Sequence, residues 1–157
     1  LPVEMGLVRD VSLATPAGLF VPGSIVRGAV AQRRHPVTYG YAGDIPLYHQ
    51  FGPYFNLPER FRGRAVLRYA PAAEVFMSGL VRSPEGIGGQ PAIVTVPVGQ
   101  GSVVLFGFDP LHRFQNHGNF AFVWNALLNW NDLRVGLPPP GRPATPSGGD
   151  DGDGGVH

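Results

Sequence analysis

The stretch PVGQGSVVLFGFDPLHRFQNHGNFAFVWNALLNW, residues 97–130, carries the strongest structural signal in this sequence. At its start, apolar runs at 92–98 and 102–108 flank Gly99-Gln100-Gly101. A three-residue connection that contains glycine, between two such runs, predicts a β-hairpin. Because Pro97 removes one backbone donor, we expect its strand to be an edge strand or to pair on one side only at that point.

A helix is expected from about Gly118 to Trp130, at the end of the same stretch. Apolar residues recur there at three- and four-residue steps and form one face, the face that packs on the core in an amphipathic helix: Phe120, Val123, Trp124, Leu127 and Leu128. Asn116 or Asn119 is placed to cap it. The order strand, polar loop, helix puts the loop where open α/β sheets usually bind ligands.

The rest of the body, residues 1–137, is rich in short β-type runs. SIVRGAVA (24–31), AVLRYA (65–70) and EVFMSGL (74–80) predict strands. Residues 32–62 read as long ordered loops around one short strand. With one convincing helix, the pattern favours an α/β fold with a mixed sheet whose missing helices come from an earlier segment.

Composition narrows the function classes. All twelve basic residues are arginine, and a net charge of +1 does not favour a nucleic-acid partner. No apolar run approaches the roughly 20 residues that cross a bilayer, and the first ten residues do not resemble a signal peptide. The chain has no cysteine, which excludes disulfides, thiolate metal sites and a cysteine nucleophile.

The two ends of the chain differ from its body. The sequence starts at Leu1 in mid-pattern, so we interpret it as a fragment truncated on its N-terminal side. From Pro138 the sequence reads PPPGRPATPSGGDDGDGGVH, which contains too few large apolar side chains to offset the entropy of ordering. We therefore expect residues 138–157 to be a disordered Pro/Gly/Asp-rich tail.

Chemistry-bearing side chains concentrate in the loop at 109–119. The candidate ligand-binding residues are Asp109, His112, Arg113, Gln115 and His117. One interpretation is an anion or carbonyl site, with backbone donors at the helix start, an arginine for charge and a histidine for proton transfer. The other is structural: Asp109 pairs with Arg113, and the amides satisfy strand and helix ends.

Three further chemistries find little support. A metal site would combine His112 and His117 with His35 or His49, but a spacing of five residues does not match a helical zinc pair. A hydrolase built on His117 and Asp109 lacks a nucleophile. The glycines of Gly86-Ile87-Gly88-Gly89 are not followed by the Lys or Ser/Thr of a phosphate loop. No catalytic residue and no metal ligand is therefore predicted.

Aromatic residues cluster between positions 39 and 55, and two interpretations stay open: Tyr39, Tyr41, Tyr48, Phe51, Tyr54 and Phe55. They line a groove for a sugar or peptide, or they pack a long loop onto its sheet. Either arrangement is compatible with the sequence.

The late stretch also resembles the C-terminal region of large bacterial zinc carboxypeptidase-like proteins of the carboxypeptidase A type. The match is carried by the glycine-linked hairpin ending in VVLFGF (103–108), by Pro110, Arg113, Gln115, His117 and Gly118, by Phe120, and by Asn125 to Leu127. His35 to Tyr41 is similar to an upstream HP-x-x-YG stretch, so the resemblance covers roughly residues 24–131.

That resemblance implies a class I glutamine amidotransferase-like domain with a flavodoxin-like α/β fold, appended to a peptidase. His117 falls in the general area of an amidotransferase histidine. The peptidase domain binds zinc through an H-x-x-E pair and a distant histidine, and this chain contains no H-x-x-E. Because the chain lacks both this zinc-binding pair and a cysteine nucleophile, the resemblance implies a noncatalytic accessory domain without its own cofactor.

The implied partner is the upstream peptidase domain of the same polypeptide, in an extracellular or periplasmic setting, and the implied role is structural support or substrate recruitment. The alternative is a carbohydrate- or peptide-binding module that uses the aromatic cluster at 39–55 and the loop at 109–119.

Overall fold

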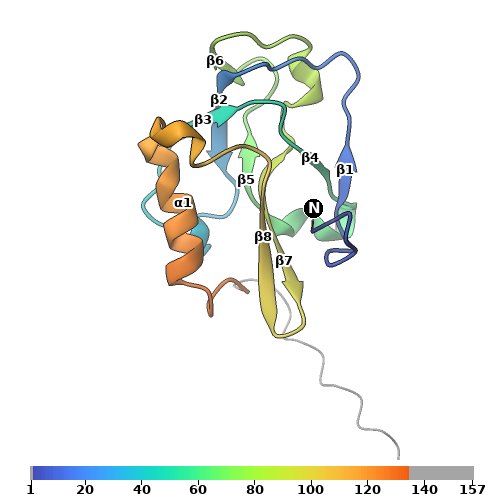
Figure 1. Ribbon diagram of the computed structural model, residues 1–157, viewed down its shortest axis with the longest axis vertical. Helices are drawn as coiled ribbons and strands as arrows, with labels where there is room; N and C mark the ends of the chain where they lie inside the picture. Colours follow the sequence, from blue (N-terminus) through green and yellow to red (C-terminus); the bar gives the residue numbers. More distant parts are fainter. Residues whose placement is uncertain (1, 135–157) are drawn as a thin grey trace, which may run out of the picture.

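The computed structural model of the chain describes residues 2–134, and the expected tail at 138–157 lies outside them. Short strands and 3-10 turns dominate, with one α-helix near the end (Figure 1). In chain order the elements are β1 (Ser12–Ala14), β2 (Ser24–Val30), η1 (Pro36–Thr38), β3 (Asp44–His49), β4 (Tyr54–Asn56), η2 (Glu59–Arg64), β5 (Ala65–Tyr69), β6 (Phe76–Ser78), η3 (Pro84–Gly86), β7 (Pro91–Val98), β8 (Gly101–Phe106), η4 (His112–Phe114) and α1 (His117–Leu128).

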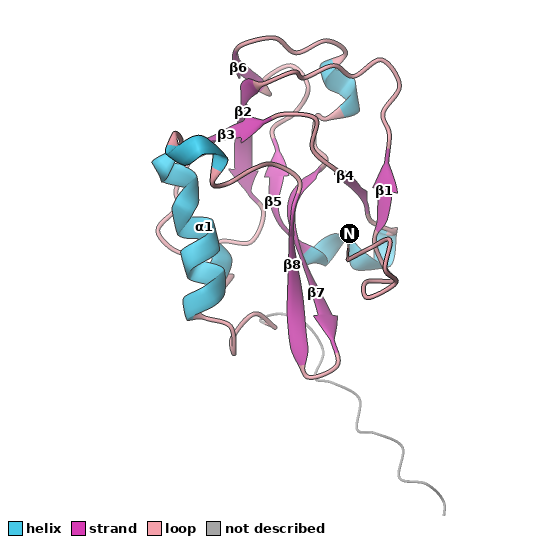
Figure 2. Cartoon of the chain, viewed as in Figure 1, coloured by secondary structure: helices cyan, strands magenta, loops and turns pink. Residues whose placement is uncertain are grey.

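The main sheet has six strands and is antiparallel throughout, and it curves as a half-barrel. Its order is β3-β2-β5-β7-β8, and β6 pairs with β2 beside β5. β2 therefore pairs with β3 along one edge, and with β6 and then β5 along the other. A separate two-stranded sheet joins β1 to β4. Figure 2 shows these strands with α1 standing to one side.

The expected flavodoxin-like, amidotransferase-like mixed sheet is wrong. Parallel strands need crossover connections, usually helices, and within the described residues the strands are joined by turns, loops and short 3-10 segments. The order strand, loop, helix at 97–130 is shared by two structures. It fits part of a βαβ unit, and it equally fits the last strand of a hairpin followed by a terminal helix, which is the arrangement found here. No described strand follows α1, so no βαβ unit forms.

Most local expectations about strands are confirmed. The runs at 24–31 and 65–70 form β2 and β5, and the run at 74–80 contains the shorter β6. The segment 32–62 holds two strands, β3 and β4, rather than one. The longer of them, β3, was not predicted because the segment is rich in proline and glycine. Pro46 lies inside β3, which is tolerated because β3 is the outer strand of the sheet and can lack one backbone donor.

The hairpin of β7 and β8 is confirmed, with a tighter turn than expected. Val98 pairs with Gly101, which leaves Gly99-Gln100 as a two-residue loop. Gly99 has φ +55°, and a positive φ at the first turn position favours glycine. β7 is an inner strand, yet its pairing with β5 ends before Pro97. The proline therefore sits where β7 pairs on one side only, as expected.

Two apolar clusters hold the sheet together. The larger one lies between the sheet, η1 and α1, and its fully buried members include Leu47, Leu67, Ile93 and Phe122. The smaller one lies on the other side of the β7–β8 hairpin, where Val94, Val96 and Leu105 meet the N-terminal segment: Val8 and Val11 are buried there, and Val3 packs against them. Adjacent residues of a strand point to opposite faces, so one hairpin serves both clusters.

Helix α1 is rotated away from the orientation that its apolar pattern predicts. Phe122 is its one buried apolar residue, whereas Trp124, Leu127 and Leu128 are exposed by 58%, 58% and 76%. Asparagines occupy much of the inner side: Asn119 is buried, and Asn125 reaches the loop carbonyls of Val37 and Tyr39. Most of the predicted apolar face is thus turned toward solvent, although Phe120 and Val123 are partly buried. Amide hydrogen bonds anchor the helix.

Candidate binding site on the loop before helix α1

The polar loop between β8 and α1 lies across strand β3. Asn116 and Asn119 both donate side-chain hydrogen bonds to the carbonyl oxygen of Pro46, at 3.1 and 2.9 Å. The Asn116 amide also donates to Asn119 Oδ1 at 2.8 Å, and the Tyr41 hydroxyl donates to the carbonyl of Gly118. Asn116 stands at the N-cap position of α1 but makes no side-chain capping bond. These amides tie the loop to the sheet instead.

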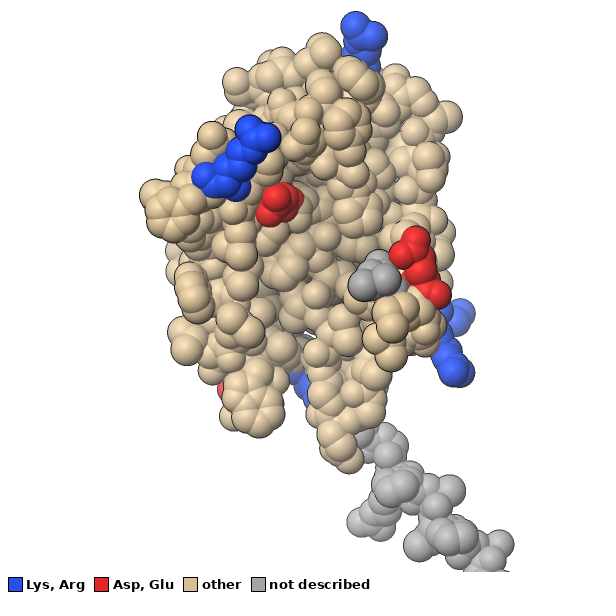
Figure 3. All heavy atoms as spheres, viewed as in Figure 1, with Lys and Arg blue, Asp and Glu red and all other residues tan. Residues whose placement is uncertain are grey.

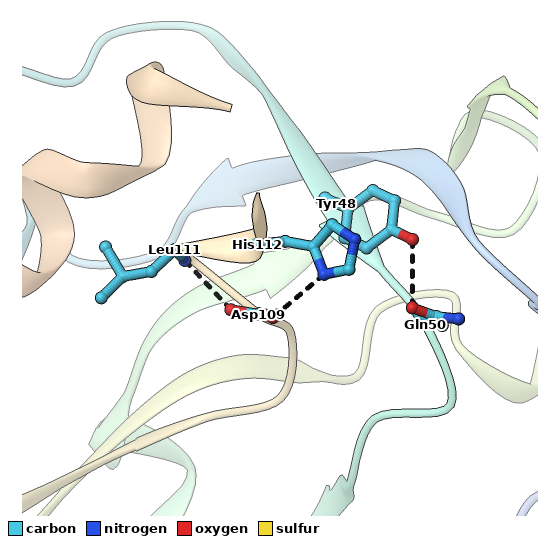
Figure 4. A network of polar contacts seen from close by, with 5 residues as sticks. All are labelled: Tyr48, Gln50, Asp109, Leu111 and His112. Atoms are coloured by element: carbon cyan, nitrogen blue, oxygen red, sulfur yellow. Dashed lines mark hydrogen bonds and ion pairs between the residues drawn. The ribbon is translucent and has the colours of Figure 1, made fainter. Parts of the chain in front are cut away.

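A stacked histidine is the centre of this region (Figure 4). The ring of His112 lies over the ring of Tyr48, with centroids 4.0 Å apart and planes 21° from parallel. Asp109 accepts a hydrogen bond from His112 Nδ1 at 3.2 Å and another from the Leu111 backbone at 3.1 Å. The Tyr48 hydroxyl donates to Gln50 Oε1 at 3.1 Å. The structural alternative that paired Asp109 with Arg113 is wrong, because His112 occupies the carboxylate.

These contacts leave one polar atom of His112 available. A carboxylate accepts and does not donate, so Nδ1 carries the hydrogen toward Asp109. Nε2 makes no hydrogen bond to any residue from 2 to 134. In the neutral ring, Nε2 is then an acceptor. Because no Ser or Thr stands among the residues around it, the pair can accept a proton or a hydrogen bond but has no nucleophile to activate.

A small hollow of about 250 Å³ opens beside the stacked rings. It is lined by Ile25, Pro46, Tyr48, His112, Gln115 and Asn116. Of the five residues predicted from sequence, the structure brings His112 and Gln115 to this hollow and sets Asp109 behind His112. The hollow offers one aromatic wall and two amides, a composition suited to a polar, uncharged group.

Arg113 stands at the tip of the loop, away from the hollow. It has φ +44°, and Phe114 after it has φ +57°. Two consecutive non-glycine residues in the left-handed region carry strain. No described residue forms an ion pair with Arg113, and Phe114 is 71% exposed. Arg113 therefore offers an exposed charge at the tip and no contact to the hollow.

His117 serves the first turn of the helix. Its Nε2 atom lies 2.8 Å from the carbonyl oxygen of Phe114, and its ring packs edge-on against Phe114 at 4.5 Å. Neither His117 nor Gln115 contacts Asp109 in the described chain. The structure thus separates His117 from the carboxylate that the hydrolase hypothesis paired with it.

Two other histidines are buried in the core and satisfied there. His49 lies between the hydroxyls of Tyr69, at 3.0 Å, and Tyr54, at 2.8 Å. Burial lowers the pKa of His49 to about 4. His35 contacts the Leu133 carbonyl at 3.3 Å and accepts from the Val37 backbone at 3.3 Å. Burial lowers its pKa as well.

These positions explain why the histidines do not assemble a metal centre. Tyr48 and His49 are neighbours on β3 and point to opposite sides of the sheet, so His49 cannot join His112. Among residues 2–134, no group of three or more His, Asp or Glu side chains is placed to hold a metal ion. The described residues do not fit a zinc site.

The aromatic cluster of residues 39–55 is divided among several places. Tyr41 stacks on Phe122 at 3.9 Å, Phe55 is buried and Tyr54 bonds His49. Tyr48 alone reaches the hollow. Half of the cluster therefore packs loops and strands together, as one of the two interpretations expects, whereas Tyr39 and Phe51 are exposed by 49% and 67%.

Some members of the site were not predicted. Ile25, Pro46 and Asn116 line the hollow, and Gln50 holds the Tyr48 hydroxyl. Alternation along residues 44–49 was the available signal, since it places Pro46 and Tyr48 on one side of a strand. Which loop crosses that side depends on tertiary packing.

Comparisons with known proteins add no family to this picture. No family model matches the chain, and no curated protein or solved structure matches it significantly. In the part of the chain that the structure describes, no helix has the length and apolar character to cross a bilayer.

Proposed function

We propose that this chain is a noncatalytic accessory domain that docks onto an adjoining folded domain of the same polypeptide. The docking surface comprises Trp124, Leu127 and Leu128 on the outer side of α1, Trp130 just after the helix, and the free edge of β8. The single observation that carries the proposal is the outward-facing apolar side of α1.

The outer side of α1 lacks the polar covering of a surface helix. Its three large side chains, Trp124, Leu127 and Leu128, are exposed by 58%, 58% and 76%, and Trp130 just after the helix is exposed by 74%. No Asp, Glu, Lys or Arg occurs from residue 114 to residue 131, and charged side chains are sparse over this side of the molecule (Figure 3). Contiguous exposed apolar patches mark interaction surfaces.

The free edge of β8 supports the same conclusion. Antiparallel pairs alternate, so the backbone groups of Ser102, Val104 and Phe106 point away from β7. No other described strand pairs with them, and β8 has none of the charged residues or prolines that usually protect an edge. A groove of about 410 Å³ separates this edge from α1, which packs mainly on η1 and β3.

The position of the N-terminal segment favours a partner on the same polypeptide. Pro2 and Val3 line a hollow of about 290 Å³ with Val104, Leu105 and Phe106 of β8. The described part of the chain therefore begins beside the free edge of β8. A domain attached there reaches the docking surface through a short connection, at high effective concentration. In a carboxypeptidase-like polypeptide, that domain would be the zinc peptidase.

Hydrogen exchange tests this proposal directly. We expect the backbone amides of Ser102, Val104 and Phe106 to exchange rapidly in the isolated chain and to be protected at least tenfold in the complete polypeptide that the gene encodes, since covered edges gain hydrogen-bond partners. Leu128→Glu should remove that protection, and Asn131→Glu, on an exposed position outside the docking surface, should not.

Three results would overturn the proposal: equal exchange in the isolated chain and the complete polypeptide, a gene that encodes no other folded domain, or a stable homodimer that Leu128→Glu dissociates. The last result would assign the docking surface to a second copy of the chain.

A second candidate function rests on the hollow beside the stacked rings of Tyr48 and His112. An aromatic wall with the amides of Gln115 and Asn116 suits a sugar hydroxyl or a peptide amide. Calorimetric titration with oligosaccharides and short peptides tests it. His112→Ala and Gln115→Ala should weaken any binding, whereas Arg113→Ala should not. The absence of heat with every ligand class would exclude it.

A further inference from the structure

A second, strongly polar pocket lies away from the loop at 109–119. It encloses about 400 Å³ between η2, β5 and the turn before β7, and it is lined by Asn56, Leu57, Arg62, Arg68, Gly88, Gly89, Gln90 and Pro91. None of these residues is acidic, and none lines the hollow beside His112. Two of the chain's twelve arginines thus face one cavity without a carboxylate in its wall.

Arg68 lies at the inner side of this pocket. It belongs to β5 and is partly buried. One terminal nitrogen donates to the carbonyl of Gly89 at 3.1 Å and the other to the carbonyl of Arg62 at 3.3 Å. A guanidinium has five N–H donors, so most remain available. Burial, and secondly the charge of Arg62, lower the pKa of Arg68.

The charge of Arg68 is not neutralised by the protein. Both of its hydrogen-bond acceptors are uncharged carbonyls, and no Asp or Glu of residues 2–134 pairs with it. The arginine fork matches the geometry of carboxylate and phosphate groups. The unmatched charge here points to an anion supplied from outside.

Arg62 adds a second positive charge at the mouth. Its guanidinium pairs with Glu59 at 2.9 Å, but the two side chains are exposed by 66% and 78%, and such surface pairs are weak. Glu59 does not line the pocket. Counting the two arginines and this glutamate, the pocket region keeps a net positive charge.

The glycines of the pocket do not form a phosphate loop. The backbone N–H groups of Gly88, Gly89 and Gln90 donate to Pro84, Ala70 and Ile87 carbonyls within the fold. Gly88 allows close packing, because a Cβ there would lie 2.5 Å from the Ala72 backbone nitrogen, and Gly89 adopts a φ of +71°. An anion in this pocket must therefore be held by side chains.

We propose that this pocket binds a small molecule through a phosphate or carboxylate group, with Arg68 as the inner anchor and Arg62 at the mouth. Arginine forks match both oxyanions and form strong charge-assisted hydrogen bonds. The side-chain amides of Asn56 and Gln90 flank them. A volume of about 400 Å³ exceeds the oxyanion alone and falls within the range of small-molecule sites. The site is independent of the docking surface.

An amide-resolved NMR titration of the whole chain with inorganic phosphate, against sodium chloride at equal ionic strength, tests the proposal. Saturable shifts are expected at Gly88, Gly89 and Gln90. Arg68→Gln and Arg62→Gln should each weaken binding by about tenfold or more, because charge-assisted hydrogen bonds are lost. Arg60→Gln is the matched control, since Arg60 belongs to η2, lies over the Phe61 ring and does not line the pocket.

The exposed Arg62 keeps the test decisive even if Arg68→Gln does not fold. A parallel titration with acetate distinguishes the two oxyanions: binding of acetate supports a carboxylate ligand, and binding of phosphate alone supports a phosphorylated one. The proposal is overturned if neither ion causes saturable shifts, or if Arg60→Gln weakens binding as much as Arg62→Gln.

Discussion

Asn125, in the middle of α1, donates a hydrogen bond from its side-chain amide to the backbone carbonyl of Tyr39 at 2.9 Å, across 86 residues of sequence. The same nitrogen lies 3.2 Å from the carbonyl of Val37, in η1. These bonds hold the polar side of α1 against the η1 loop. They explain why the apolar side of the helix faces solvent.

Replacing Asn125 with alanine should destabilise the fold by about 1–2 kcal/mol, because the loop carbonyls lose their donor in a partly buried place. Urea denaturation followed by circular dichroism measures the change. Asn131→Ala is the control, since Asn131 is exposed. Equal free energies of unfolding for the two variants would contradict the anchoring role of Asn125.

The orientation of α1 predicts opposite costs for two apolar substitutions. Phe122→Ala should cost roughly 3–5 kcal/mol, because a fully buried aromatic ring is removed. Leu128→Gln should change the stability of the isolated chain by no more than about 0.5 kcal/mol, as at ordinary surface positions. The midpoints of urea unfolding of the two variants measure this difference in stability. A large loss from Leu128→Gln would mean that the outer side of α1 is covered.

Stability should fall in mild acid because His49 is buried without charge. Its folded-state pKa is lowered to about 4, below its ordinary value of about 6.5. Between these values the unfolded chain binds the proton and the folded chain does not, so the free energy of unfolding decreases as the pH falls. The loss from this residue should reach roughly 3 kcal/mol at pH 4, and His35 adds to it in the same direction.

The pH effect is measured by urea unfolding from pH 7 to pH 4, together with the NMR titration of the His49 ring. A His49 resonance that titrates near pH 6.5 in the folded protein would contradict the prediction.

Backbone strain at the loop tip should be relieved by glycine. Arg113 has φ +44°, a region that glycine adopts without cost, so Arg113→Gly should leave stability unchanged or raise it by up to about 1 kcal/mol. Arg113→Ala is the matched control, because it removes the same guanidinium and keeps the Cβ. In thermal unfolding, the glycine variant should have a higher midpoint temperature than the alanine variant. The reverse order would contradict the presence of backbone strain at Arg113.

The candidate site shows where sequence reasoning succeeds and where it stops. Asp109 and His112 lie three residues apart, so their pairing is a local event within one loop. The stacking of His112 on Tyr48 joins residues 64 positions apart, and it requires the loop to cross β3. Neither spacing nor composition reports such a crossing. The pocket of Arg62 and Arg68 was missed for the same reason, since its walls come from three separate segments.

By itself the sequence determined the local elements of this protein: the strands near 24–30 and 65–69, the glycine hairpin of β7 and β8, and a helix from about 118. Each follows from backbone and side-chain preferences within a few residues. Only the tertiary structure decided how these elements associate. Antiparallel pairing and the outward apolar side of α1 depend on partners far along the chain, because strand runs do not encode their direction and an amphipathic helix does not encode which side its amides will anchor.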